Sequence, residues 1–269
     1  MKKIIKYLCV LAAVSGFYSC EIDNLQEPTS SIKGTIYDHN KNPMRLTQGK
    51  GSMSIRMTEL SWLDKKRQDG ELNERVTDRE LNVKMDGTYL NDKIFDGTYL
   101  VYPWNGAWYP LDSSEYKTIQ LKSGSTTTVD FDVIPYFEVE WVEEPRIVTY
   151  NEGEHPNSTP TNPRPAGDYF RASAKFKKVY KDGVDHPGVK AATFIVGNTH
   201  WVDGMSDYWN SDFAVTDDQE GEAIAFVSNR TIEFTGMTYY FRIGFKNNRP
   251  ASEGDQKWNY TTVKEIEVK

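Results

Sequence analysis

Tryptophan and tyrosine concentrate in three short segments of this chain. They are Tyr102, Trp104, Trp108 and Tyr109; Trp201, Tyr208 and Trp209; and Trp258 and Tyr260. Rings of this kind combine an apolar body with a polar tip, and their flat faces can stack on the C–H faces of sugar rings. The second segment also carries Asp203 and Asp207, whose carboxylates can bond hydroxyl groups. The residue types therefore point to stacking of a hydroxyl-rich ligand.

The first segment, YPWNGAWYP at 102–110, reads as a loop framed by two prolines. Its Asn-Gly pair favours a turn, and loops lie at the surface. We predict that Trp104 anchors the loop to the core, while Trp108 and Tyr109 face outward beyond the turn. In the alternative, these rings only cover the core of their own domain. The candidate ligand contacts are Trp108, Tyr109, Trp201, Asp203, Asp207, Tyr208 and Trp209.

Other chemistries find little support in the residues. Nucleophilic catalysis needs a nucleophile beside a base, and the chain contains no Gly-x-Ser-x-Gly motif. The four histidines, at 39, 155, 186 and 200, lack the short spacings of a zinc site. The acidic stretch 217–222 could offer oxygens to calcium but lacks an EF-hand register, so that question stays open. We predict no enzyme activity and no cofactor, with a carboxylate-pair glycosidase as the weaker alternative.

The N-terminus predicts secretion and a lipid anchor. Three lysines precede an apolar run and then small residues, which is the order of a secretory signal over 1–19. The segment ending in Ser19-Cys20 resembles a bacterial lipobox, which implies that Cys20 is lipidated after cleavage. Cys20 is then the only cysteine of the mature chain, so it has no partner for an internal disulfide. Residues 20–30 would form a polar tether to the membrane.

Composition limits the partners and indicates the fold class. The net charge is −7. Removing the three signal lysines would make the mature chain about three charges more acidic, which argues against nucleic acid, whose binding requires phosphate neutralisation. Thr, Tyr, Val, Phe and Ile recur in short runs divided by Gly, Asn, Asp and Pro, which is typical of an all-β chain. We predict two antiparallel β-sandwich domains, at 31–135 and 136–269.

Alternating patterns predict the strands of the first domain at 31–38, 52–60 and 125–134. The pentapeptide DGTYL occurs at 86–90 and again at 96–100, and each copy can start a turn and enter a strand. We expect Tyr99 in the second copy to pack inward.

These segments carry a resemblance to a known family. GTIYD, DGTYLNDKIFDGTYLVYP and TTTVDFDVIPYFEVEW are similar to transthyretin-like, carboxypeptidase regulatory-like sandwiches. The motif VIPY at 133–136, which ends the first domain, resembles that of a two-domain Bacteroidetes lipoprotein family of unknown function, domain-of-unknown-function family 3823. The resemblance implies a lipoprotein of the outer membrane, on its cell-surface or periplasmic face, beside a glycan-import complex of a polysaccharide-utilisation system.

The second domain is expected to be an immunoglobulin-like sandwich. The segment 231–245 predicts its clearest strand pair, and 236–242 resembles the entry to strand F of fibronectin type III domains. There a tyrosine bonds back to the backbone at a corner, a part that Tyr239 or Tyr240 can play. The proline-rich stretch 151–167 is predicted as a loop within this domain. The functional expectation is glycan binding, with a structural or adhesive module that binds protein as the alternative.

Overall fold

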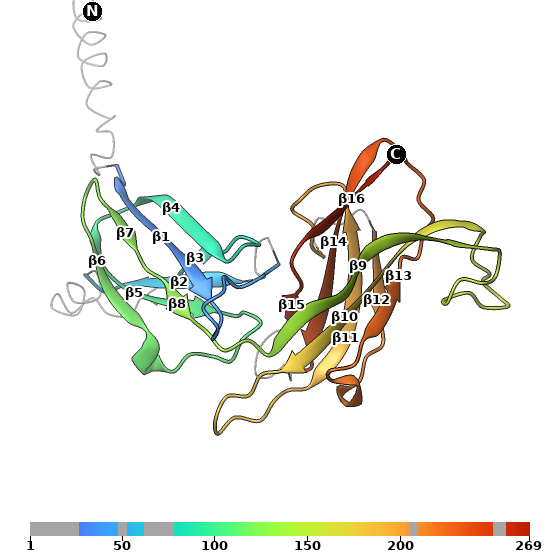
Figure 1. Ribbon diagram of the computed structural model, residues 1–269. Helices are drawn as coiled ribbons and strands as arrows, with labels where there is room; N and C mark the ends of the chain where they lie inside the picture. The colour runs from blue at the N-terminus through green and yellow to red at the C-terminus, as the bar shows by residue number, and fades with distance from the viewer. Residues whose placement is uncertain (1–26, 48–52, 62–77, 205–208, 250–256) are drawn as a thin grey trace, which may run out of the picture.

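The computed structural model describes residues 27–47, 53–61, 78–204, 209–249 and 257–269 (Figure 1). Over these ranges the chain is all-β, and its strands form four sheets in two lobes that are joined where β8 leads into β9 (Figure 1). The predicted signal segment and the lipidation residue Cys20 lie outside the described residues. The described residues include no helix with the length and apolar composition needed to cross a bilayer.

The first lobe contains two facing sheets. Its strands are β1 (Ser30–Tyr37), β2 (Ser54–Glu59), β3 (Arg79–Asn82), β4 (Thr88–Ile94), β5 (Gly97–Trp104), β6 (Lys117–Leu121), β7 (Thr126–Thr128) and β8 (Phe131–Asp132), with a short 3-10 turn η1 (Ser113–Glu115) before β6. One sheet has the order β4-β1-β7, with β8 also paired to β1, and the other has the order β3-β2-β5-β6. The short strands β3 and β6 were not predicted from the sequence.

The DGTYL repeat carries the chain from one sheet of this lobe to the other. β4 belongs to the β1 sheet and β5 to the β2 sheet, and each strand begins within one copy of the repeat. Tyr89 and Tyr99 therefore enter the same core from opposite sides, and both are buried. The Tyr99 hydroxyl donates to the Phe95 carbonyl oxygen at 3.0 Å. The expectation that Tyr99 packs inward is confirmed.

The predicted strand at 125–134 is interrupted. β7 and β8 are separate, and both run parallel to β1 rather than antiparallel. The break falls where the Asp130 carboxylate accepts the backbone N–H of Thr35 at 2.8 Å, in the place of a strand carbonyl. Hydrophobic alternation continues through the break, because Val129, Phe131 and Val133 all enter the core. The sequence pattern could therefore not reveal the interruption.

The second lobe also contains two sheets. Its strands are β9 (Phe137–Tyr150), β10 (Gly167–Lys178), β11 (Val189–Gly197), β12 (Trp209–Phe213), β13 (Ile224–Val227), β14 (Met237–Asn247), β15 (Trp258–Tyr260) and β16 (Lys264–Val268). The orders are β13-β10-β9 and β12-β11-β14-β15, with β16 also paired to β14. Tyr150 at the end of β9 pairs with Gly167 at the start of β10. The loop at 151–167 therefore connects two paired strands and lies within this lobe, as predicted.

Residues 231–245 form one strand rather than the predicted pair. Only β14 has a strand ladder, and the segment before it is held by single contacts such as the Ile232 N–H to the Asp168 carbonyl oxygen at 2.8 Å. Tyr239 begins the buried part of β14, and its hydroxyl donates to the Phe234 carbonyl oxygen at 3.1 Å. This backward bond fixes the corner that the segment turns, which is the part expected of Tyr239 or Tyr240.

Candidate functional site

The loop at 102–110 turns back on itself directly after β5. Asn105 has a φ of 57°, a left-handed conformation that Asn tolerates better than most residues. A Cβ atom on Gly106 would lie 2.1 Å from the Trp108 ring, so glycine is required there. The Trp108 indole thus folds back against the turn and enters the first core, and its backbone bridges to Pro135.

The predicted division of labour between the two tryptophans of this loop is wrong, because the structure reverses it. Trp104 has 40% of its surface exposed, whereas Trp108 has 2%. The reason is the length of β5, which continues to Trp104 instead of ending at Tyr102. Alternation along a strand places Val101 on the core face and Trp104 on the opposite face.

Tyr109 was expected to face a ligand but instead enters the core of the second lobe. It packs in that core beside Tyr136, with ring centres 4.8 Å apart. Its hydroxyl donates to the Val179 carbonyl oxygen at 3.0 Å, and its N–H donates to the Ile134 carbonyl oxygen at 2.9 Å. Burial raises the pKa of Tyr109 to about 12. Tyr109 therefore joins the two lobes.

The second predicted cluster does not form one open site among the described residues. Trp209 lies in β12 and is buried in the second core, and Asp203 is fully buried. Trp201 has 44% of its surface exposed and meets the ring of His200 edge-on at 5.8 Å. Asp207 and Tyr208 lie outside the described residues. The sequence pattern predicted an exposed loop here and missed that β12 carries Trp209 inward.

Trp104 is the exposed member of an aromatic cluster with Tyr102 and Tyr116 on the outer face of the β2–β5 sheet. The Arg56 guanidinium lies over its ring, 3.7 Å from the ring centre. Tyr102 meets Trp104 edge-on at 6.3 Å and stacks on Tyr116 at 4.0 Å with 6° between the ring planes. The ladder explains the placement, because Arg56 pairs with Tyr102 two residues from Trp104.

Acidic groups hold Arg56 in this position. Its Nε donates to Glu80 at 3.1 Å, and its Nη1 lies 3.6 Å from an Asp78 oxygen. Burial alone would lower the pKa of Arg56, but hydrogen bonds from Arg56 to Tyr102 and Glu80 leave it raised. Arg56, Glu80 and Tyr116 were not among the site residues predicted from the sequence. The alternation at 52–60 nevertheless places Arg56 on the outer face of its strand.

A cleft of about 90 Å³ lies beside Trp104. It is lined by Pro103, Trp104, Asn105, Gly106, Trp108, Pro110, Leu111, Tyr116 and Arg249. Arg249, just after β14, is the contribution of the second lobe. Arg56, whose guanidinium lies over the same indole, is not part of this lining. A flat ring, an apolar floor and polar groups at the rim form a small stacking site.

The position of Arg249 beside Trp104 depends on a polar junction between the lobes. Asn259 of β15 donates to the Ala107 carbonyl oxygen at 3.0 Å and accepts from the Phe137 N–H at 3.2 Å. Arg242 is buried, donates to the Leu46 carbonyl oxygen at 2.9 Å, and lies over the Tyr260 ring at 4.2 Å. Burial lowers the pKa of Arg242 to about 10.

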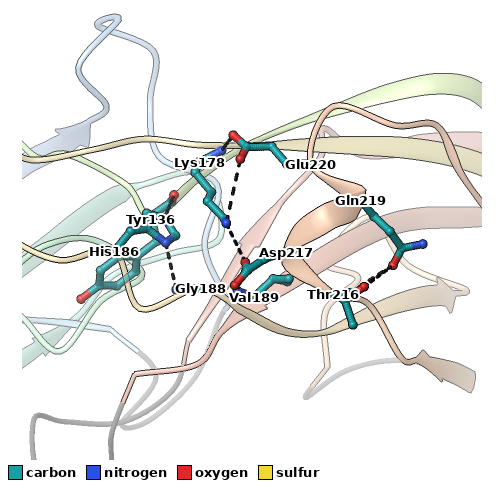
Figure 2. Close-up of polar contacts among 9 residues, drawn as sticks. All are labelled: Tyr136, Lys178, His186, Gly188, Val189, Thr216, Asp217, Gln219 and Glu220. Atoms are coloured by element: carbon teal, nitrogen blue, oxygen red, sulfur yellow. Dashed lines mark hydrogen bonds and ion pairs between the residues drawn. The ribbon is translucent and has the colours of Figure 1, made fainter.

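A second polar network fixes the crossover between the lobes at Tyr136 (Figure 2). The Nδ1 atom of His186 accepts the Gly188 N–H at 2.9 Å, so its Nε2–H donates to the Tyr136 carbonyl oxygen at 2.8 Å. Burial lowers the pKa of His186. Beside it, Asp217 pairs with Lys178 at 2.9 Å and accepts the Val189 N–H at 2.9 Å.

The acidic stretch 217–222 is therefore used in this network. Its first residues form the 3-10 turn η2 (Asp217–Gln219), and Asp217 and Glu220 both lie within ion-pair distance of Lys178. Burial would raise the pKa of Asp217, but its bonds to Lys178 and the Val189 N–H lower it overall. The described residues hold no group of three or more His, Cys, Asp or Glu arranged to bind a metal ion.

These features define an all-β, two-lobed protein with an aromatic surface cleft at the end of its first lobe. Residues 30–134 match the family model described as "Protein of unknown function (DUF3823) N-terminal domain". None of the curated proteins matches the chain.

Solved structures share the fold. A DUF3823 family protein from Bacteroides uniformis is 21% identical, with a TM-score of 0.69 over 90% of this chain and 100% of that one. A DUF3823 family protein from Parabacteroides merdae is 16% identical, with a TM-score of 0.60 over the same shares. A Bacteroides uniformis protein described as a "putative carbohydrate binding protein" is 19% identical, with a TM-score of 0.61 over 90% of this chain and 100% of that one.

Proposed function

We propose that this protein binds glycan without catalysing its cleavage, and that Trp104 is the stacking platform. The observation that carries the proposal is the exposed Trp104 indole with Arg56 fixed against it at 3.7 Å. An exposed apolar surface that borders a cleft and is rimmed by polar groups is the arrangement found in ligand-binding grooves. The rigid support suits such a ligand, because a group ordered in advance loses less entropy on binding.

The chemistry around Trp104 favours a sugar over other ligands. The indole offers a flat apolar face, and Asn105, Tyr116 and Arg249 place polar groups at the cleft. A pyranose ring presents the complementary surface, with a C–H face and hydroxyl groups around its rim. The small volume of the cleft, about 90 Å³, suits contact with one sugar unit rather than enclosure of a whole ligand.

We further propose that the protein is a lipoprotein of the outer membrane, anchored through Cys20 and exposed at the cell surface beside a glycan-import complex. The residues that support the anchor are the signal-like segment and the single mature cysteine. The carbohydrate-binding description of a structural neighbour supports the glycan assignment. A scaffold that binds protein is the competing function.

A glycan array tests the proposal, with the soluble chain lacking residues 1–20. Wild type should bind a related set of glycans, and the Trp104→Ala variant should bind the same glycans more weakly. Trp201→Ala is the matched control, because Trp201 is exposed to a similar extent but lies on the second lobe. An empty array for the wild type, or equal binding by the Trp104→Ala variant, would reject the platform and favour the scaffold.

A further inference from the structure

We propose a second carbohydrate site in a polar cleft between the lobes, which takes an uncharged, hydroxyl-rich saccharide. The cleft has a volume of about 190 Å³. It is lined by Asp38, Asn40, Asn42, Pro43, Met44 and Arg45 from the first lobe, by Pro135 at the crossover, and by Phe137, Glu138, Val139, Glu140, Asn259 and Tyr260 from the second. Ligand sites occur preferentially at such domain interfaces.

The wall of the first lobe is a fixed turn rather than a loose loop. The Asp38 carboxylate accepts the N–H groups of Asn40 and Asn42, both at 2.8 Å. The Asn40 side chain donates across the cleft to Glu138 at 2.7 Å. These contacts hold amide and carboxylate groups of both lobes in place before any ligand arrives, which lowers the entropy cost of binding.

The cleft offers both kinds of hydrogen-bonding group that a sugar needs. The carboxylates of Asp38, Glu138 and Glu140 accept from hydroxyl groups, and each retains lone pairs beyond its present contacts. Arg45 supplies donors, and its positive charge interacts with the carboxylates of Asp38 and Glu140 in the same lining. Vicinal hydroxyls of one sugar ring match such paired oxygen and nitrogen atoms.

The charges select against an acidic ligand. Three carboxylates and one guanidinium line the cleft. The nearby Lys175 and Lys177 already lie within ion-pair distance of Glu140 and Glu138, at 3.2 Å and 3.9 Å. An uncharged polyol is preferred over a metal ion, because the described residues contain no metal-binding group of three.

A second hollow extends the cleft along β9. It has a volume of about 260 Å³ and is lined by Glu138, Glu140, Lys175, Phe176, Lys177 and Gly221. Because Glu138 and Glu140 border both hollows, an extended saccharide can occupy them in succession. The rings of Phe137 and Tyr260 are buried, so hydrogen bonds rather than stacking would hold the ligand. This site does not require the Trp104 cleft.

Calorimetric titration of the soluble chain lacking residues 1–20 tests the proposal. The probes are xylopentaose, mannopentaose and cellopentaose, with pentagalacturonate as the charged comparison. On a Trp104→Ala background, at least one neutral pentaose should still bind, and pentagalacturonate should not. Adding Asn42→Ala and Glu140→Gln should weaken that residual binding at least tenfold. Adding Glu144→Gln instead should leave it unchanged, because Glu144 is on the same strand and also pairs with a lysine, yet does not line the cleft.

Hydrogen exchange provides a check that needs no variant. The same neutral pentaose should protect amides at 38–45 and 137–140 in the wild type. The second site is refuted if no neutral pentaose binds the Trp104→Ala chain, if the cleft variants bind as tightly as that chain, or if those amides stay unprotected. If Trp104→Ala binds as tightly as the wild type and only the cleft variants lose affinity, the second site stands and the proposed Trp104 platform is refuted.

Discussion

The guanidinium of Arg56 lies over the indole of Trp104, 3.7 Å from its ring centre, on the outer face of the first lobe. Arg56 belongs to β2 and Trp104 to β5, so the contact depends on the pairing of these two strands and not on closeness along the chain. Glu80 and Asp78 form ion pairs with the same guanidinium. Such a contact contributes about 0.5–1 kcal/mol at an exposed site, so its main effect is to fix the ring rather than to stabilise the fold.

Arg56→Ala should therefore weaken glycan binding more than it weakens the fold. We expect a loss of less than about 1 kcal/mol in the free energy of unfolding, because Trp104 is exposed and Arg56 is only half-buried. Binding should fall because Trp104 loses its support. Titration and denaturant melts measure the two effects. Lys246→Ala is the control, since Lys246 lies over Trp258 at 5.4 Å outside the cleft. Undiminished affinity in Arg56→Ala would show that the ring needs no such support.

Trp108→Ala should unfold the first lobe much more readily than Trp104→Ala. Trp108 is buried against Gly106 in the core, and truncation of a buried aromatic residue costs about 3–5 kcal/mol. Trp104→Ala removes an exposed ring and should cost less than about 1 kcal/mol. Urea melts of the two variants compare these costs side by side. Similar midpoints for both would mean that the loop does not contribute to the core.

The stability of the second lobe should decrease as the pH falls below about 6.5. Burial lowers the pKa of His186 in the folded chain, so the unfolded chain binds the extra proton first. The stability is full above the unfolded pKa, near 6.5, and is lost toward the folded value at up to about 1.4 kcal/mol per pH unit.

Denaturant melts between pH 5 and 7.5 measure this slope. His186→Asn should reduce the slope of stability against pH. The control His200→Asn, at an exposed position, should leave the slope unchanged. Part of the slope should survive in His186→Asn, because burial also lowers the pKa of His155. The surroundings of His186 include Lys178, Asp217, Glu220 and Tyr109. A slope that His186→Asn leaves intact would assign the titration to other groups.

Cys20→Ala should release the protein from the membrane or leave its precursor uncleaved. Lipid at Cys20 would bury many methylene groups at about 0.8 kcal/mol each, and the mature chain has no other cysteine to replace it. Membrane fractionation and labelling with a radioactive fatty acid give the readout. The anchor assignment fails if the variant fractionates and labels as the wild type does.

The sequence was sufficient for the all-β class and for residues whose local pattern decides their place. Tyr99 follows a turn glycine at a strand entry, so its burial could be predicted, and the corner bond made by Tyr239 could be narrowed to Tyr239 or Tyr240. The facing of Trp104 and Trp108 could not be predicted, because it depends on whether β5 ends two residues earlier or later. A strand end shifts by such amounts with pairing to a partner strand, here β2, that is distant in sequence.

The candidate site was harder to predict than the fold for the same reason. Arg56, Tyr116 and Arg249 are far from Trp104 in sequence, and only the ladder and the junction bring them near it. Tyr109 shows the reverse case, in which an aromatic residue of the loop packs against another lobe. Local composition marked the loop that lines the candidate cleft but could not assign which of its rings would stay exposed.

The most direct test of the account is calorimetric titration of the best glycan from the array into the wild type and the Trp104→Ala variant. Stacking of one ring on Trp104 should contribute about 1–3 kcal/mol, by analogy with base stacking on aromatic side chains. Trp104→Ala, which should leave the fold stable, is expected to lose affinity about 5- to 150-fold. Equal affinities in the two proteins would contradict the account.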